Sequence, residues 1–128
     1  MSDLRSPLSQ ARGLGSAKDG VHHWWMQRVT AVALIPLSLW FVFAIAHYHM
    51  ASYEMMVSWV KAPLVAVALS LYFFALFYHA ALGIQVVIED YVGNEGLKIG
   101  SIIVCKFGLY ALGAASIFSV LKIAFGAA

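Results

Sequence analysis

The stretch from residue 62 to residue 88, APLVAVALSLYFFALFYHAALGIQVVI, decides the class of this protein. It contains no Asp, Glu, Lys or Arg, and it exceeds the roughly 20 residues that a helix needs to cross a bilayer core. Backbone N–H and C=O groups find no water inside a bilayer, so they must bond to one another within the segment, as they do in a helix. The stretch therefore predicts a transmembrane helix over about residues 62–89.

Two further stretches, at about residues 29–48 and 99–125, are charge-free or nearly so, the latter with lysines near both of its ends. Of the 128 residues, 62% are hydrophobic and 11% are charged, whereas about a quarter of the residues in soluble proteins are charged. We therefore expect an all-α membrane protein with three transmembrane helices. Pro36 predicts a bend in the first helix, because it leaves the carbonyl of Val32 without its usual donor, whereas Pro63 falls in the first turn of the second helix and costs nothing there.

Charge and cysteine content exclude several classes of function. The net charge is +2 and the 8 Lys and Arg residues are spread along the chain, so we expect no basic patch and no nucleic-acid partner. The single cysteine, Cys105, allows neither an internal disulfide nor a multi-cysteine metal site.

Basic residues gather on one side of the predicted spans. Those on the first side are Arg5, Arg12, Lys18, Arg28 and Lys98, and those on the other side are Lys61 and Lys122. The positive-inside rule then predicts a cytoplasmic N-terminus. We expect the chain to divide into a cytoplasmic N-terminal segment, residues 1–27, and a three-helix transmembrane anchor domain, residues 28–128. The polar N-terminus lacks the apolar core of a signal peptide, so we expect the spans themselves to direct membrane insertion.

The links between the spans, HMASYEMMVSWVK and EDYVGNEGLK, are predicted to be short and polar. Three helices make a poor closed pore, and no internal repeat of the kind found in transporters is visible. We therefore expect a partner with further membrane helices. Gly108, Ala111 and Ala115 offer one close-packing face for that partner.

One histidine, His79, lies in the interior of the second predicted helix. It shares a helical stripe with Gly83 and Asp90, and the eleven steps to Asp90 amount to a rise of about 16 Å. An imidazole at that depth needs partners for both of its nitrogens. Two interpretations remain open: a histidine bonded to a neighbouring helix beside a packing glycine, or a haem ligand beside a glycine that makes room for a flat macrocycle.

Asp90 and Tyr91 end the same helix. They are compatible with an acidic helix end in water and a tyrosine of the interfacial aromatic belt. The acid is unfavourable at a helix C-terminus, because it faces the negative end of the helix dipole, which suggests a basic partner or a chemical role. A phenol oriented by a carboxylate is also suited to donating a hydrogen bond and protons to a quinone.

Two motifs make the sequence similar to the smaller of the two hydrophobic membrane anchors of bacterial succinate dehydrogenases (respiratory complex II, succinate:quinone oxidoreductase). The first motif, G-V-H-x5-R-x-T, opens the first span at Gly20, Val21, His22, Arg28 and Thr30. The second, H-A-x-x-G-x-Q-V-x3-D-Y, is formed by His79, Ala80, Gly83, Gln85, Val86, Asp90 and Tyr91. The three spans in this order extend the resemblance over nearly the whole chain.

The resemblance implies a role for each matching residue. His79 corresponds to the axial ligand of haem b, with the other ligand in the larger anchor. His22 and Arg28 correspond to residues near the haem propionates. The sequence leaves open whether His22 or the adjacent His23 approaches the propionate. Tyr91 corresponds to the residue that hydrogen-bonds ubiquinone, with Asp90 beside it. The implied partners are the larger anchor, the iron-sulfur subunit and the flavoprotein subunit.

The resemblance places the protein in the bacterial inner membrane, as a non-catalytic anchor of an enzyme of the respiratory chain and tricarboxylic acid cycle. Two alternatives remain open from the sequence. The chain is also compatible with the anchor of a fumarate reductase, which runs the reaction in reverse. A third reading is a non-haem assembly or transport subunit in which His79 is structural or relays protons.

Overall fold

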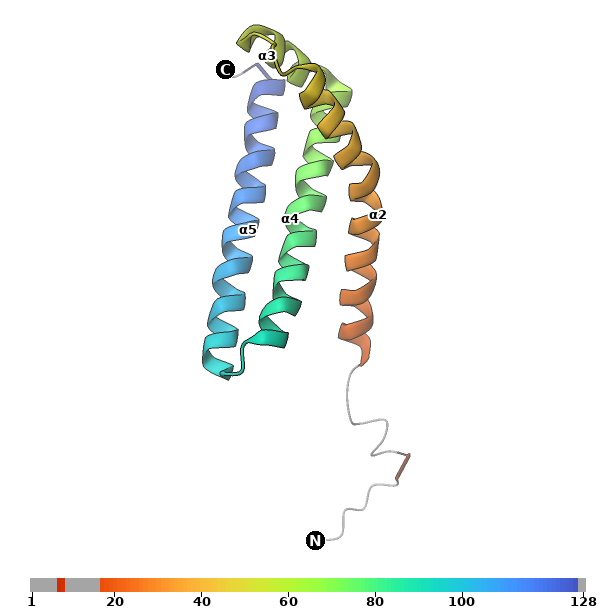
Figure 1. Ribbon diagram of the computed structural model, residues 1–128, viewed down its shortest axis with the longest axis vertical. Coiled ribbons are helices and arrows are strands. Elements are labelled where there is room, and N and C mark those ends of the chain that lie inside the picture. Colours follow the sequence, from red (N-terminus) through yellow and green to blue (C-terminus); the bar gives the residue numbers. More distant parts are fainter. Residues whose placement is uncertain (1–6, 9–16, 127–128) are drawn as a thin grey trace.

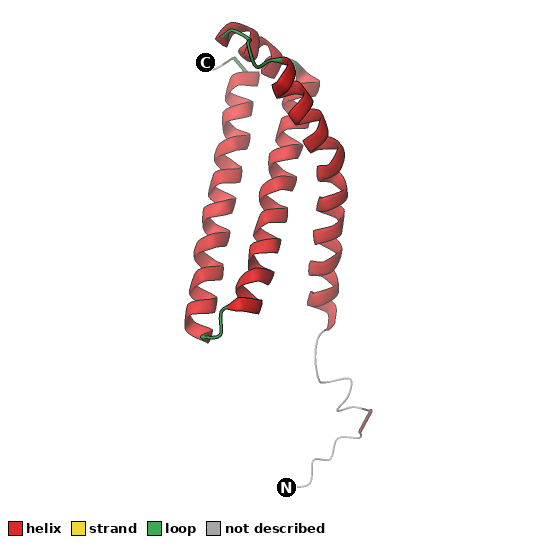
Figure 2. Cartoon of the chain, in the orientation of Figure 1, coloured by secondary structure: helices red, strands yellow, loops and turns green. Residues whose placement is uncertain are grey.

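The computed structural model describes residues 7–8 and 17–126, and its four named elements are all helices. Three of them are long and apolar enough to cross a membrane: α2 (Ala17–His47), α4 (Pro63–Tyr91) and α5 (Glu95–Ala124). They stand side by side, with the short helix α3 (Tyr53–Lys61) across one end (Figures 1 and 2). The expected all-α membrane fold with three spans is confirmed.

The long helices extend beyond the apolar stretches that predict them. The helix α2 begins at Ala17, well before Val29, and contains Pro36, and Figure 1 shows it curving along its length. The helix α4 begins with Pro63 in its first turn, as expected. The helices continue into the polar residues at the ends of each span, because each helix still pairs its own backbone N–H and C=O groups where it leaves the hydrocarbon layer. Arg5 and Arg12, which entered the prediction of a cytoplasmic N-terminus, lie outside the described residues.

The link between the first two spans is more ordered than its sequence suggested. It contains α3, which is capped at its N-terminus by Ser52, whose hydroxyl accepts a hydrogen bond from the Met55 N–H at 3.3 Å. The ring centroid of Trp59 in α3 lies 5.9 Å from the ring centroid of Trp40 and 5.3 Å from that of Tyr48. A segment this short is held by such tertiary packing rather than by its own propensity, which is why the sequence alone indicated a simple link.

The helix α4 occupies the middle of the bundle and contacts both α2 and α5, whereas α2 and α5 do not contact each other in the described structure (Figure 1). Its buried residues are Ala66, Leu69, Ala75, Ala81, Leu82 and Ile88. Between α2 and α4, Phe41 stacks on Tyr72 with ring centroids 4.8 Å apart. Most other large apolar side chains face outward, where a lipid layer or a partner protein covers them.

The contact between α4 and α5 depends on a glycine that the sequence analysis did not single out. Gly113 is buried in α5, and a Cβ atom built on it would lie 3.1 Å from the Cβ and 3.2 Å from the Cγ of Phe77 in α4. The residues that we expected to form a close-packing face, Gly108, Ala111 and Ala115, are exposed and remain available to a partner. Gly113 thus closes the bundle internally, as small residues do between membrane helices.

This contact predicts that Gly113→Val destabilises the protein. The added side chain would force the α4 and α5 backbones apart, and overpacking of this kind costs about 1–3 kcal/mol. The thermal unfolding midpoint of the full-length protein in mild detergent should fall. Gly100→Val is the matched control, because it places the same β-branched residue in the same helix where no atom lies within 4 Å. Equal midpoints for the two variants would contradict the proposed role of Gly113.

Candidate functional site

A small polar cluster joins α2 to α4 within the apolar bundle. The Thr30 Oγ1 atom of α2 lies 2.9 Å from His79 Nδ1 of α4. The side-chain nitrogen of Gln27 lies 3.5 Å from His79 Nε2. Thr30 also lies 2.7 Å from the carbonyl oxygen of Met26 and 3.1 Å from that of Gln27, so its hydroxyl bonds back to its own helix. Both nitrogens of His79 thus face α2, and only Nδ1 has a partner within ordinary hydrogen-bond distance.

The sequence analysis placed Thr30 in a motif but assigned no role to it or to Gln27. The two residues are three positions apart, which puts them on one face of a helix. That spacing of polar residues near the start of an apolar span was the available signal. It did not identify His79 as their partner, because their pairing depends on the relative register of α2 and α4.

His79 also lines a groove between α4 and α5, here called the α4–α5 groove. This groove has a volume of about 590 Å³ and is lined by His79, Ala80, Gly83, Ile84, Val87, Cys105, Gly108, Leu109 and Leu112. All of these residues except His79 are small or apolar, and the two glycines leave room at the groove's wall. The groove is therefore almost wholly apolar, and both ring nitrogens of His79 face α2 instead.

A second hollow, here called the α2–α4 hollow, opens next to Gly83 on the side of α2. It is lined by Gly20, His23, Trp24, Gln27, Arg28, Gly83 and Val86. Arg28 lies with its guanidinium carbon 4.4 Å from the centroid of the Trp24 ring, a cation–π contact. Two polar atoms of the hollow's residues, His23 Nε2 and Gln27 Oε1, are buried without a hydrogen-bond partner in the described structure. Buried polar atoms are usually paired, so each of these atoms calls for a partner beyond the described residues.

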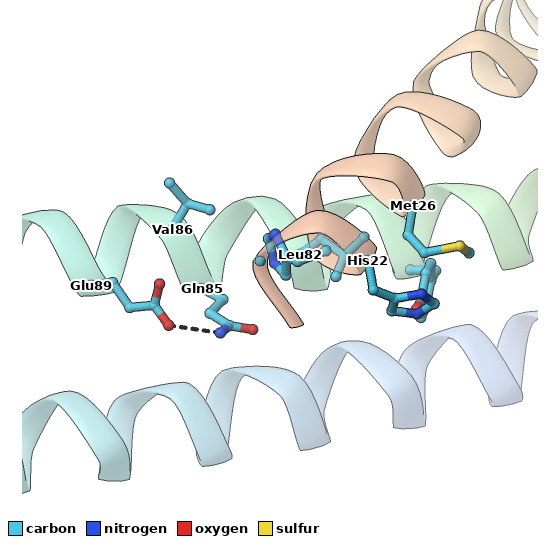
Figure 3. Close-up of a pocket in the computed structure, with 9 residues that line it drawn as sticks. His22, Met26, Leu82, Gln85, Val86 and Glu89 are labelled. Atoms are coloured by element: carbon cyan, nitrogen blue, oxygen red, sulfur yellow. Dashed lines mark hydrogen bonds between the residues drawn. The ribbon is translucent and has the colours of Figure 1, made fainter. Parts of the chain in front are cut away.

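His22 and His23 share one cavity but differ in exposure and in their contact with the α2–α4 hollow. His23 is half-buried and lines the α2–α4 hollow together with Arg28, whereas His22 is exposed and does not line it. Both histidines line a third cavity, here called the end pocket, with Met26, Tyr78, Gln85 and Glu89 among its other residues. Figure 3 shows His22 and Met26 of α2 beside Gln85 and Glu89 of α4, with the 2.7 Å hydrogen bond that Gln85 donates to Glu89.

Asp90 and Tyr91 lie at the end of α4, beyond these cavities. Both are exposed, Tyr91 by 85%, and within the described residues neither side chain makes a hydrogen bond. The expected orientation of the phenol by the carboxylate is therefore absent from the described chain by itself. The start of α2 and the end of α4 meet at the same end of the bundle, because the end pocket contains residues of both (Figure 1).

The described part of the chain forms no metal site by itself. Among residues 7–8 and 17–126, no three His, Cys, Asp or Glu side chains gather closely enough to hold a metal ion. His79 can supply at most one ligand to a metal that other groups complete.

The fold and the site together define a small three-span membrane protein with a half-buried histidine bonded to a neighbouring helix and with many exposed apolar side chains. Its sequence matches the family described as succinate dehydrogenase/fumarate reductase transmembrane subunit over residues 2–123. The chain belongs to this family.

Individual relatives agree with this assignment. The succinate dehydrogenase hydrophobic membrane anchor subunit of Rickettsia bellii is 36% identical over 104 residues, which cover 81% of this chain and 83% of the relative. The protein of the same name from Paracoccus denitrificans is 30% identical over 122 residues, covering 95% of this chain and 94% of the relative. The chain is therefore a multi-pass membrane protein of a bacterial type and an anchor subunit of succinate dehydrogenase, associated with the other subunits of that enzyme.

Proposed function

We propose that this anchor binds haem b through His79, jointly with the larger anchor of the same enzyme, and contributes Tyr91 and Asp90 to the site where ubiquinone is reduced. The observation that carries the haem proposal is the environment of His79. One of its ring nitrogens, Nδ1, is engaged by Thr30 at 2.9 Å, and the other, Nε2, lies 3.5 Å from the side-chain nitrogen of Gln27, a residue that lines the α2–α4 hollow. Buried imidazole ligands of metals characteristically have their second nitrogen held in this way.

The residues present fit a haem. A macrocycle needs space beside the helix, and Gly83 leaves the wall of the α2–α4 hollow without a side chain on the side where His79 Nε2 faces Gln27. His79 would hold the haem iron from this chain, and a further ligand would come from the larger anchor. When bound, the haem supplies one-electron transfer, while the chain's own residues hold and orient it.

The propionate carboxylates of such a haem need cationic or N–H donors. Arg28 lies in the α2–α4 hollow, and the buried His23 Nε2 atom there has no partner in the described structure. Arg28 can pair with a carboxylate in the geometry that guanidinium groups favour. His22, expected near the propionates from the resemblance, remains part of the proposal, but the shared hollow and the unpartnered nitrogen favour His23 for the closer contact.

The quinone proposal rests on Tyr91 and Asp90. The phenol projects from the end of α4 and is 85% exposed, so it is free to donate its O–H to a quinone carbonyl at the membrane edge. The remaining walls of the site would come from the larger anchor and the iron-sulfur subunit. Succinate oxidation would take place on the flavoprotein subunit, on the cytoplasmic side where the basic residues predict the N-terminus to lie.

Two other functions are also compatible with this chain, and the haem content of the complex distinguishes one of them from the main proposal. A fumarate reductase anchor would share the haem and reverse the reaction. A non-haem assembly or transport subunit, with His79 relaying protons, would copurify with its partners but without haem b. The optical spectrum of the purified complex distinguishes the haem-binding functions from the third.

The haem proposal predicts the outcome of His79→Leu in the whole complex. Leucine fills a similar volume but offers no ligand, so the low-spin haem b spectrum should be lost or severely changed. The amount of assembled complex, measured by copurification of the other subunits, is the control. An unchanged spectrum would rule out His79 as the ligand.

Another prediction separates the two adjacent histidines. His23→Gln should shift the haem midpoint potential or lower haem occupancy more than His22→Gln does, because His23 shares the α2–α4 hollow with Arg28. The two variants change the same residue type one position apart, so each is the control for the other. A larger effect at His22 would reverse the assignment.

The quinone proposal predicts the effect of Tyr91→Phe, which removes only the exposed hydroxyl. Ubiquinone reduction by the complex should slow by about 100- to 10,000-fold if the hydroxyl acts as a proton donor. Succinate oxidation with a soluble artificial electron acceptor should be unchanged, since Tyr91 does not contact the flavoprotein in this proposal. Equal loss in both assays would indicate damage to assembly instead.

A further inference from the structure

The hydroxyl of Thr30 is crowded by three hydrogen-bonding atoms. Its oxygen lies 2.7 Å from the Met26 carbonyl oxygen, 3.1 Å from the Gln27 carbonyl oxygen and 2.9 Å from His79 Nδ1. Thr30 is 5% exposed, and among the described residues it is the one buried residue with a polar side chain. Water is therefore a poor alternative partner for this hydroxyl, and the protein atoms around it must share its single proton.

The number of protons decides the direction of each bond. The two carbonyl oxygens can only accept, and the shorter contact, to Met26, has the usual length of an O–H···O bond. The Thr30 hydroxyl proton therefore goes to the Met26 carbonyl. The contact between Thr30 Oγ1 and His79 Nδ1 then needs a proton from the imidazole, so Nδ1–H donates to Thr30.

This assignment fixes the other nitrogen of His79. In a neutral imidazole with Nδ1 protonated, Nε2 carries the lone pair. The Gln27 side-chain N–H faces that lone pair at 3.5 Å, which is too long for a strong hydrogen bond. The lone pair of Nε2 is therefore only weakly engaged and is available to a stronger partner.

We propose that Thr30 is a positioning residue that holds His79 in the Nδ1–H tautomer and so presents Nε2 to the haem iron. This inference rests on the proposed haem-binding function. Threonine suits the task because its hydroxyl bonds back to the helix carbonyl, which fixes the oxygen, while its methyl group packs. The Met26 carbonyl, Thr30 and His79 then form one directed chain of hydrogen bonds from α2 to α4.

A hydrogen bond from Nδ1–H to Thr30 makes the imidazole a stronger electron donor, which favours the oxidised over the reduced form of the haem. Removing the acceptor should raise the midpoint potential. Loss of such a supporting group changes metal binding by about 10- to 100-fold. A tenfold change in the balance of the two forms corresponds to about 59 mV for a one-electron couple.

The test is a redox titration of haem b in the assembled complex carrying Thr30→Val. Valine has nearly the same shape but no hydroxyl. We expect its introduction to change the ratio of oxidised to reduced haem at least tenfold, which corresponds to a rise in midpoint potential of at least about 59 mV. Thr30→Ser keeps the hydroxyl and should retain the wild-type potential. Ser70→Ala is the matched control, because Ser70 makes the same kind of bond to a carbonyl of its own helix, at 2.8 Å to Ala66, without contact to His79.

The outcomes are distinguishable. A wild-type potential in Thr30→Val, with haem still bound and still lost in His79→Leu, overturns this inference and leaves the proposed function standing. Absence of haem b from the wild-type complex, or an unchanged spectrum in His79→Leu, overturns the proposed function as well. A raised potential, or selective loss of haem from an assembled Thr30→Val complex, supports the inference if Thr30→Ser and Ser70→Ala remain normal. Thr30→Ala, which only removes atoms, is titrated instead if the valine variant does not assemble.

Discussion

The packing of α4 between α2 and α5 is the interaction on which the other features depend. The helices α2 and α5 do not contact each other in the part of the chain that the structure describes, so each takes its position from α4. On one side, α4 is held to α2 by the stacked rings of Phe41 and Tyr72 and by the bond between Thr30 and His79. On the other side, Gly113 allows α5 to approach Phe77 closely.

Because α4 lies between the other two long helices, His79 is close to both of them. His79 reaches α2 through Thr30 and, about one turn of α4 before Gly83, lines the groove toward α5. An unpaired imidazole would be costly in an apolar layer, and the bond to Thr30 offsets part of that cost. The bundle remains open at the groove and at its outer faces, which suits one component of a larger membrane complex.

Much of this fold follows from the sequence. The charge-free lengths around residues 62–88 and their two counterparts predict three spanning helices, because no other conformation of a single apolar segment satisfies the backbone in a bilayer. The helix α3 did not follow, since its formation depends on Trp59 packing against Trp40 and Tyr48. The close contact at Gly113 did not follow either, because several small residues of α5 look equivalent until the rotation of the helix about its axis is known.

For the site, the sequence by itself determined which residues bring chemistry: a histidine inside a span, basic residues and histidines before the first span, and an acid and a phenol after the second. The tertiary structure alone decided which of them meet. It brought Thr30 and Gln27 to His79, placed His23 but not His22 in the α2–α4 hollow, and left Tyr91 projecting from the bundle. The physical reason is that hydrophobicity fixes the depth of each helix in the membrane, whereas the register and rotation that pair side chains come from packing between helices.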